Sequence, residues 1–161
     1  MQKIFSLFAL ICFVSVSLEV MAQKEENNAA AEDSLSEEQR YLDAIEKSCL
    51  SKIADGFQVV KTYRFNVSTT PKEGYKIHQS YIFSSTARYN IAICGNWSEA
   101  QSPVIYVFDT HNKKLAESRE GSLRITPQQG GIVRIVYEFK TPPVQLLGVS
   151  VIASAPKPKK K

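Results

Sequence analysis

The stretch Ser80–Ile93 constrains the fold more than any other part of this sequence. Within it, Tyr81 and Phe83 alternate with polar or small residues, and the alternation resumes at Tyr89 and Ile91 after a short polar break. Apolar residues at every second position are typical of a strand with one buried face. The stretch therefore predicts two antiparallel strands joined by a turn.

The same pattern recurs toward the C-terminus, where short apolar or alternating runs are separated by turns rich in Gly, Pro, Asn and Asp. These runs are 57–67, 77–83, 89–93, 104–108, a short one near Leu115, 123–125, 133–139 and 147–153. Seven to eight strands at this spacing predict an all-β fold, an antiparallel β-sandwich or jelly roll over residues 57–154. The nearly continuous apolar run 104–108 predicts a central strand buried on both faces. Such an architecture hosts many functions, so the function has to be argued from a site.

One amphipathic helix is predicted ahead of the strands, over residues 34–56. Ser34 and Glu37 fit a capping box, in which each side chain bonds the other residue's backbone N–H. Apolar residues then recur at helical spacing, at Leu42, Ile45, Cys49 and Ile53. Gly56 is expected to take the left-handed conformation that ends a helix.

The N-terminus predicts export. Lys3 precedes the apolar run 4–16, and Val20 and Ala22 fit a signal-peptidase site, so residues 1–22 are expected to be a removed secretory signal. The alternative is a retained membrane anchor, but the run is shorter than the roughly 20 residues that a spanning helix needs. Residues 23–33 are polar and predict a flexible leader. We therefore expect a periplasmic, cell-surface or extracellular protein.

The positive charge is concentrated at the C-terminus. The 161-residue chain has a formal net charge of +4, and Lys157, Lys159, Lys160 and Lys161 all lie in the Pro-rich segment 155–161. This segment predicts a disordered, solubilising tail that could touch an anionic surface weakly. Without it the chain is close to neutral, which argues against a nucleic-acid partner.

Cys49 and Cys94 are the two cysteines that follow the predicted signal, because Cys12 lies within it. An even pair in an oxidising compartment suggests one disulfide, which would stabilise the chain by roughly 4 kcal/mol. The alternative is two buried free thiols that pack as small apolar side chains.

Residues 81–151 carry a resemblance to a known group. The segments SYIFSSTARYNIAIC, VIYVFDTHNKKLAES, GGIVRIVYEF and GVSVIAS resemble a group of secreted Bacteroidetes-type proteins, in which a Cys-bearing helix precedes a small β-sandwich. They are similar, more distantly, to sandwich domains of the pre-peptidase C-terminal type. The matching positions are Asp109, Asn112, Lys113, Lys114, Leu115, Gly148, Val149, Ser150 and Val151. The resemblance implies this fold and export, and it implies no activity.

The loop 95–103 is the candidate ligand-binding site. It holds the single tryptophan, Trp97, beside Asn96, Glu99 and Gln101. An exposed indole can stack on a sugar or a protein partner while neighbouring amides supply hydrogen bonds. The alternative is that Trp97 folds back over one end of the sandwich.

The turn 109–114 is a weaker candidate for a metal site. Asp109, Asn112 and His111 could offer oxygen and nitrogen ligands to calcium from one turn. The alternative is that Asp and Asn bond the backbone of their own turn. No other cofactor is expected.

Catalytic motifs are missing from the sequence. His78 and His111 have no nucleophile or metal-binding motif beside them, and the acidic residues are scattered singly. We therefore expect an exported, non-enzymatic binding or structural module at the cell envelope or outside the cell, with a protein or polysaccharide partner. The alternatives are a carbohydrate-binding or adhesion protein that uses the Trp97 loop, and a hydrolase that uses His78 or His111.

Overall fold

The computed structural model describes residues 36–68 and 75–158. The predicted signal and leader, the capping residue Ser34, the turn 69–74 and Lys159–Lys161 lie outside the described residues. The chain divides into two compact units, residues 1–40 and 41–161. The packing of helix and sheets described here lies within residues 41–158.

One α-helix, one 3₁₀ turn and eight strands make up the described elements. They are α2 (Glu37–Leu50), β1 (Gln58–Ser68), β2 (Tyr75–Phe83), β3 (Ala87–Gly95), η1 (Glu99–Gln101), β4 (Val104–Phe108), β5 (Lys114–Ser118), β6 (Ser122–Ile125), β7 (Gly131–Phe139) and β8 (Gln145–Pro156).

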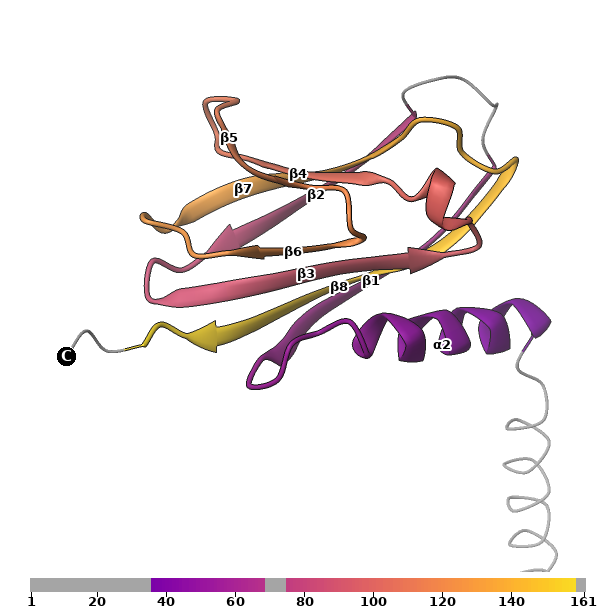
Figure 1. The fold of residues 1–161 in the computed structure, drawn as a ribbon, viewed down its shortest axis with the longest axis horizontal. Coiled ribbons are helices and arrows are strands. Elements are labelled where there is room, and N and C mark those ends of the chain that lie inside the picture. The colour runs from indigo at the N-terminus through magenta and orange to yellow at the C-terminus, as the bar shows by residue number, and fades with distance from the viewer. Residues whose placement is uncertain (1–35, 69–74, 159–161) are drawn as a thin grey trace, which may run out of the picture. The chain divides into compact units, whose positions relative to one another are not determined.

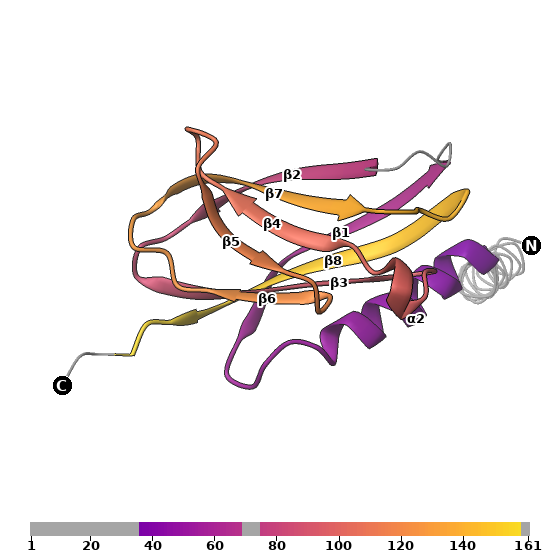
Figure 2. The same cartoon turned by 45° about the horizontal axis from the view of Figure 1, so that its top comes forward.

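The strands form two four-stranded antiparallel sheets. The order is β1-β8-β3-β6 in sheet A and β2-β7-β4-β5 in sheet B. The sheets lie face to face, and α2 runs along the outer face of sheet A (Figure 1). The view in Figure 2 separates the two sheets. The predicted antiparallel β-sandwich with an N-terminal helix is confirmed.

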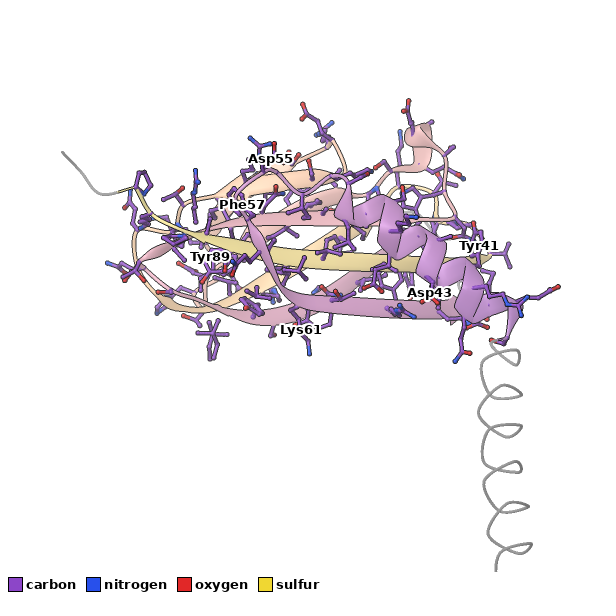
Figure 3. The ribbon with its side chains drawn as sticks, turned by 90° about the horizontal axis from the view of Figure 1, so that it is seen from below. Tyr41, Asp43, Asp55, Phe57, Lys61 and Tyr89 are labelled. Atoms are coloured by element: carbon purple, nitrogen blue, oxygen red, sulfur yellow. The ribbon has the colours of Figure 1, made fainter. Side chains whose placement is uncertain are left out.

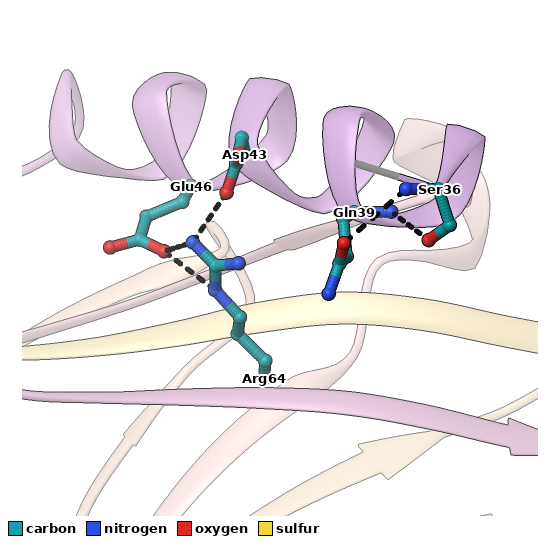
Figure 4. A network of polar contacts seen from close by, with 5 residues as sticks. All are labelled: Ser36, Gln39, Asp43, Glu46 and Arg64. Atoms are coloured by element: carbon teal, nitrogen blue, oxygen red, sulfur yellow. Dashed lines mark hydrogen bonds and ion pairs between the residues drawn. The ribbon is translucent and has the colours of Figure 1, made fainter. Parts of the chain in front are cut away.

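A capping box begins the helix. The backbone N–H of Gln39 donates to Ser36 Oγ (3.2 Å), and the N–H of Ser36 donates to Gln39 Oε1 (3.3 Å; Figure 4). Each side chain thus satisfies a backbone donor that the helix leaves unpaired. The box lies two residues after the predicted pair, of which Glu37 is the first helical residue.

The helix is shorter than the predicted range 34–56. It ends at Leu50, where the amides of Lys52 and Ile53 bond back to carbonyls three residues earlier. Gly56 has the predicted left-handed conformation (φ 77°), but it belongs to the turn that leads into β1 and not to the helix end. No helix in the described ranges is long and apolar enough to cross a membrane.

The apolar face of the helix packs on sheet A. Leu42, Ile45 and Cys49 are buried, at the three- and four-residue spacing that keeps side chains on one helix face. Their neighbours on the sheet are Ala92, Cys94, Val149 and Val151. Figure 3 views the molecule from this side, with Tyr41 and Asp43 on the helix that crosses the sheet.

β3 and β8 are buried on both faces, because the helix covers one side of sheet A and sheet B covers the other. On β3, Ile91 and Ile93 face the sandwich core, whereas Ala92 and Cys94 face the helix. The sequence predicted only one buried face for this stretch. The second face comes from a helix some 40 residues earlier in the chain, and strand periodicity contains no information about it.

The expectation that β4 is buried on both faces is wrong. Ile105 and Val107 are fully buried, but Val104, Tyr106 and Phe108 on the opposite face are only half-buried. This outer face of sheet B has no helix over it in the described chain. Cationic side chains partly cover the rings instead, with Lys114 over Tyr106 and Arg134 over Phe108.

One buried polar pair joins the two sheets. The hydroxyls of Tyr137 on β7 and Ser150 on β8 are hydrogen-bonded in the sandwich core. Burial raises the pKa of Tyr137 well above its usual range, because the phenolate would have to form away from water. Both hydroxyls are therefore satisfied by each other, as buried polar groups must be.

The last strand extends into the predicted tail. β8 continues through Pro156, and Ala155 is buried opposite Arg88 on β3. Lys157 then donates its backbone N–H to the carbonyl of Thr86 (3.0 Å) and its ammonium to the carbonyl of Pro127 (2.5 Å). Residues 155–157 therefore belong to the fold. Their partners on β3 and at Thr86 and Pro127 are distant in sequence, so the composition of the tail alone could not predict them.

Candidate functional site

Trp97 lies half-buried against the core. Its ring is parallel to that of Phe65, with centroids 6.4 Å apart, and meets Phe139 edge-on at 5.0 Å. It occupies the space beside Gly95, where a Cβ atom would come within 1.9 Å of the indole. This placement corresponds to the alternative in which the indole covers one end of the sandwich, and it leaves little of the ring for a ligand.

The polar neighbours of Trp97 are also engaged within the chain. Asn96 donates its amide to the carbonyl of Gln145 (2.6 Å) and accepts the N–H of Leu147 (2.9 Å). Gln101 Oε1 accepts both the N–H and the hydroxyl of Ser98. Glu99 lies exposed on η1. These amides shape the loop, so the predicted hydrogen-bonding groups are not free to meet a ligand without rearrangement.

The turn 109–113 is built by Asp109. Its Oδ1 accepts the backbone N–H groups of His111 (2.8 Å) and Lys113 (2.9 Å). Asn112 has φ 61°, the left-handed conformation that Asn tolerates, and its Oδ1 accepts Arg134 Nη2 (2.8 Å). The side-chain oxygens of the two predicted calcium ligands therefore bond the turn itself and Arg134 on β7. Over the described residues, no three His, Cys, Asp or Glu side chains converge as a metal site.

The two histidines are exposed and lie on different elements. His78 is on the outer face of β2, opposite Val136 on β7. His111 is at the β4–β5 turn, with Nδ1 3.5 Å from the hydroxyl of its neighbour Thr110. That distance is at the limit of a hydrogen bond, so it gives no sign of an activated nucleophile.

A cleft of about 650 Å³ opens at the end of the sandwich opposite Trp97. The β4–β5 turn (109–115) forms one wall and the β6–β7 connection (125–133) forms the other. Both lie at the same end as the last residues of β8 (Figure 1). We call this the end cleft. Its volume is within the range of roughly 300–1,000 Å³ that ligand pockets have.

Internal hydrogen bonds hold the walls of the end cleft. The two bonds to Asp109 keep one wall in shape, and the Arg134 bond to Asn112 ties that turn to β7. The bond from Lys157 to Pro127 ties the other wall to the end of β8. A cleft whose walls are held in this way changes little when a ligand enters, which lowers the entropy lost on binding.

Charged and apolar side chains line the end cleft together. Asp109, Lys113 and Lys114 come from one wall, with Leu115 beside them, and Ile132 comes from the other. Lys114 is paired with Glu117 (2.6 Å), which raises the pKa of Lys114 and lowers that of Glu117. The amides of Gln128 and Gln129 add hydrogen-bonding groups to the second wall.

Sequence reasoning did not predict the end cleft. Its two walls are separated in the sequence by β5 and β6, and each wall alone reads as an ordinary surface turn. The only available signal was the pair of neighbouring lysines, Lys113 and Lys114. The cleft exists because the two sheets bring both connections to one end of the sandwich.

The two cysteines are neighbours at the interface between the helix and sheet A. Cys49 and Cys94 are both buried in one cluster, and their interaction raises the pKa of Cys49 and lowers that of Cys94. Both are free, so the predicted disulfide is not present in this structure. The prediction paired the correct residues in space, while the covalent bond between them stays a prediction.

The fold and the cleft define a class of protein: a two-sheet antiparallel β-sandwich with a helix on one face and an open cleft at one end. Comparison with protein-family models and with curated proteins finds no match to this chain.

Proposed function

We propose that this protein is an exported, non-enzymatic binding module that holds its ligand in the end cleft. The observation that carries the proposal is the cleft itself, about 650 Å³ in volume, between two connections that are tied to the rest of the sandwich. Loops at the end of a rigid β-sandwich are a common place for binding residues, since the sheets hold them in position. The resemblance to secreted small sandwich proteins supports export.

The chemistry of the cleft favours binding over catalysis. The Asp109 carboxylate already accepts two backbone N–H groups, and the exposed His111 imidazole lies 3.5 Å from the Thr110 hydroxyl, at the limit of a hydrogen bond. A hydrolase would need a nucleophile, a base and an orienting group within hydrogen-bond reach. The described lining residues show no such arrangement.

We propose an acidic polysaccharide segment as the ligand. Lys113 offers an exposed ammonium to a carboxylate, and the amides of Gln128 and Gln129 can bond sugar hydroxyls. The exposed side chains of Leu115 and Ile132 offer apolar surface to the carbon face of a sugar ring. A protein partner is the alternative that the experiment has to distinguish.

The test is a titration of the isotopically labelled protein with uronic-acid oligosaccharides, followed by amide NMR shifts. We expect saturable shifts confined to 109–115 and 125–133. Lys113→Ala should weaken binding about fivefold, the effect of losing one exposed charge contact. Lys140→Ala is the matched control, because this exposed lysine follows β7 at the other end of the sandwich. The Lys140→Ala variant should bind the oligosaccharides with unchanged affinity.

Three results would contradict this proposal. Shifts that centre on 95–103 would transfer the site to the Trp97 loop and restore the carbohydrate-binding alternative there. Equal weakening by Lys113→Ala and Lys140→Ala would mean that acidic sugars respond only to overall charge. Saturable binding of an acidic peptide at the cleft, with no response to the oligosaccharides, would replace the polysaccharide by a protein partner.

Export is part of the same proposal. Removal of residues 1–22 would leave Gln23 as the first residue, which N-terminal sequencing of the secreted protein can check. An oxidising compartment would also favour a disulfide between Cys49 and Cys94. Lys157 contributes to the fold through Pro127, so any contact of the tail with an anionic surface would rest on Lys159, Lys160 and Lys161.

A further inference from the structure

The interface between α2 and sheet A contains two neighbouring buried thiols. Cys49 lies in the last turn of the helix and Cys94 near the end of β3. Cys49 Sγ is 3.6 Å from the carbonyl oxygen of Val149, and Val149 is the residue directly opposite Cys94 in the β3–β8 register. The helix therefore places the Cys49 thiol at the position on sheet A where Cys94 lies.

Their surroundings make the two thiols different. Cys49 is fully buried, whereas Cys94 keeps 7% of its surface exposed. The interaction with Cys49 lowers the pKa of Cys94, and the ammonium of Lys52 lowers it further. The same interaction, together with burial, raises the pKa of Cys49. Cys94 is thus the thiol that more readily becomes a thiolate, which is the nucleophile in disulfide exchange.

We propose that Cys94 and Cys49 are the attacking and resolving thiols of an oxidisable pair, which closes into a disulfide by exchange with a small-molecule disulfide and fastens α2 to sheet A. The proposal rests on the proposed function only for the oxidising compartment that supplies this disulfide. It is independent of the end cleft.

The exchange balances in two steps. The Cys94 thiolate attacks one sulfur of the oxidant R–S–S–R, which forms a mixed disulfide and releases R–S⁻. The released thiolate accepts the proton of Cys49, and the Cys49 sulfur then attacks the Cys94 sulfur and displaces the second R–S⁻, which takes up a proton from solvent. The two protein thiols lose two electrons in total, and the oxidant is reduced to two thiols.

Without the bond, the described contacts that hold the helix are few. Leu42 and Ile45 are its buried apolar side chains besides Cys49, and Arg64 on β1 forms ion pairs with Asp43 and Glu46. A covalent link at the last turn would hold this layer even when those contacts open. We therefore expect oxidation to slow hydrogen exchange in α2 and to raise the thermal midpoint by roughly 10 °C.

The experiment uses the full chain with Cys12→Ser, so that Cys49 and Cys94 are the only thiols. The reduced protein is treated with oxidised glutathione and analysed by intact mass and peptide mapping. We expect a loss of about 2 Da, a cross-linked Cys49–Cys94 peptide pair, and reversal by dithiothreitol. In that background Cys49→Ser should trap glutathione on Cys94, whereas Cys94→Ser should form the adduct on Cys49 at least about tenfold more slowly.

Other outcomes would overturn the inference. Oxidation that yields only a double glutathione adduct, or no reaction while the denatured protein reacts fully, would show that the pair does not close. Equal adduct rates in the two single variants would remove the assigned roles. Far-UV circular dichroism verifies that both variants fold. Oligosaccharide titration of the same samples separates this inference from the end cleft, since cross-linking should proceed whether or not a ligand binds.

Discussion

Two glycines, Gly95 and Gly148, lie opposite each other on β3 and β8, and aromatic rings fill the space that their missing side chains leave. A Cβ atom on Gly148 would come within 2.4 Å of the Phe65 ring, and one on Gly95 would overlap the Trp97 indole. The rings of Phe65 and Trp97 in turn stack on each other. At this position glycine is needed because a ring approaches the backbone, and the turn chemistry that usually explains glycine is not involved.

The placement of Trp97 gives the first prediction. Trp97→Ala should lower the free energy of unfolding by about 2–4 kcal/mol, because it removes a large side chain that packs on Phe65 and Phe139 and leaves the space beside Gly95 empty. Trp97→Phe, which keeps a ring there, should recover part of the loss. Urea unfolding followed by circular dichroism measures both. An unchanged stability of Trp97→Ala would mean that the indole is free, as a ligand-binding role requires.

At the scale of elements, α2 is held to the sandwich by contacts of two kinds. Ile45 is buried against sheet A. Arg64 on β1 reaches Glu46 with two nitrogens (2.9 and 2.5 Å) and Asp43 with one (2.6 Å; Figure 4), and these carboxylates raise its pKa. The side chain of Arg64 is 42% exposed, so solvent screens much of this attraction. Apolar burial should therefore dominate the docking of the helix.

This comparison gives a second prediction, made for the reduced protein. Ile45→Ala should lower the free energy of unfolding by about 2–4 kcal/mol, since a buried side chain is lost and a cavity remains. Arg64→Gln should lower it by less than about 1 kcal/mol. Urea unfolding at low and high salt separates the two effects, because only the Arg64→Gln effect should shrink as salt rises. A loss for Arg64→Gln at low salt as large as that for Ile45→Ala, which then shrinks at high salt, would mean that the ion pairs determine helix docking.

On the scale of the whole molecule, β8 is the strand on which sheet A depends. It pairs with β1 on one side and β3 on the other, and its residues contribute to both the sandwich core and the helix interface. The β1–β8 ladder joins residues near the start of the sandwich to the end of the chain. Pairings so distant in sequence predict slow folding, in milliseconds to seconds, as in other β-sandwiches.

A truncation pair tests the role of β8. A chain ending at Thr141 should not unfold cooperatively, because β1 and β3 lose their shared partner and the cores lose Leu146, Val149 and Ile152. A chain ending at Pro158 keeps β8 and the bond from Lys157 to Pro127, so it should unfold in one transition like the full chain. Thermal circular dichroism and amide NMR dispersion provide the comparison. Cooperative unfolding of the shorter chain would show that the sandwich can form without its central strand.

Strand positions were predictable from local sequence, but the burial of each face was not. Alternation at Tyr89 and Ile91 identified β3, yet Ala92 and Cys94 are buried as well because the helix covers them. The run 104–108 suggested burial on both faces, and only Ile105 and Val107 are fully buried. An apolar residue shows what a strand could bury, and the neighbouring layer determines whether that face is covered.

The sequence by itself determined the fold class, the strands and one helix, since these follow from short-range periodicity and turn residues. The tertiary structure decided the rest. Residues far apart in the chain come together in the β1–β8–β3–β6 pairing, in the buried cluster that holds Cys49 and Cys94, and in the cleft between 109–115 and 125–133. Their physical cause is the packing of the sheets and helix as a whole, in which each layer buries the apolar face of the next.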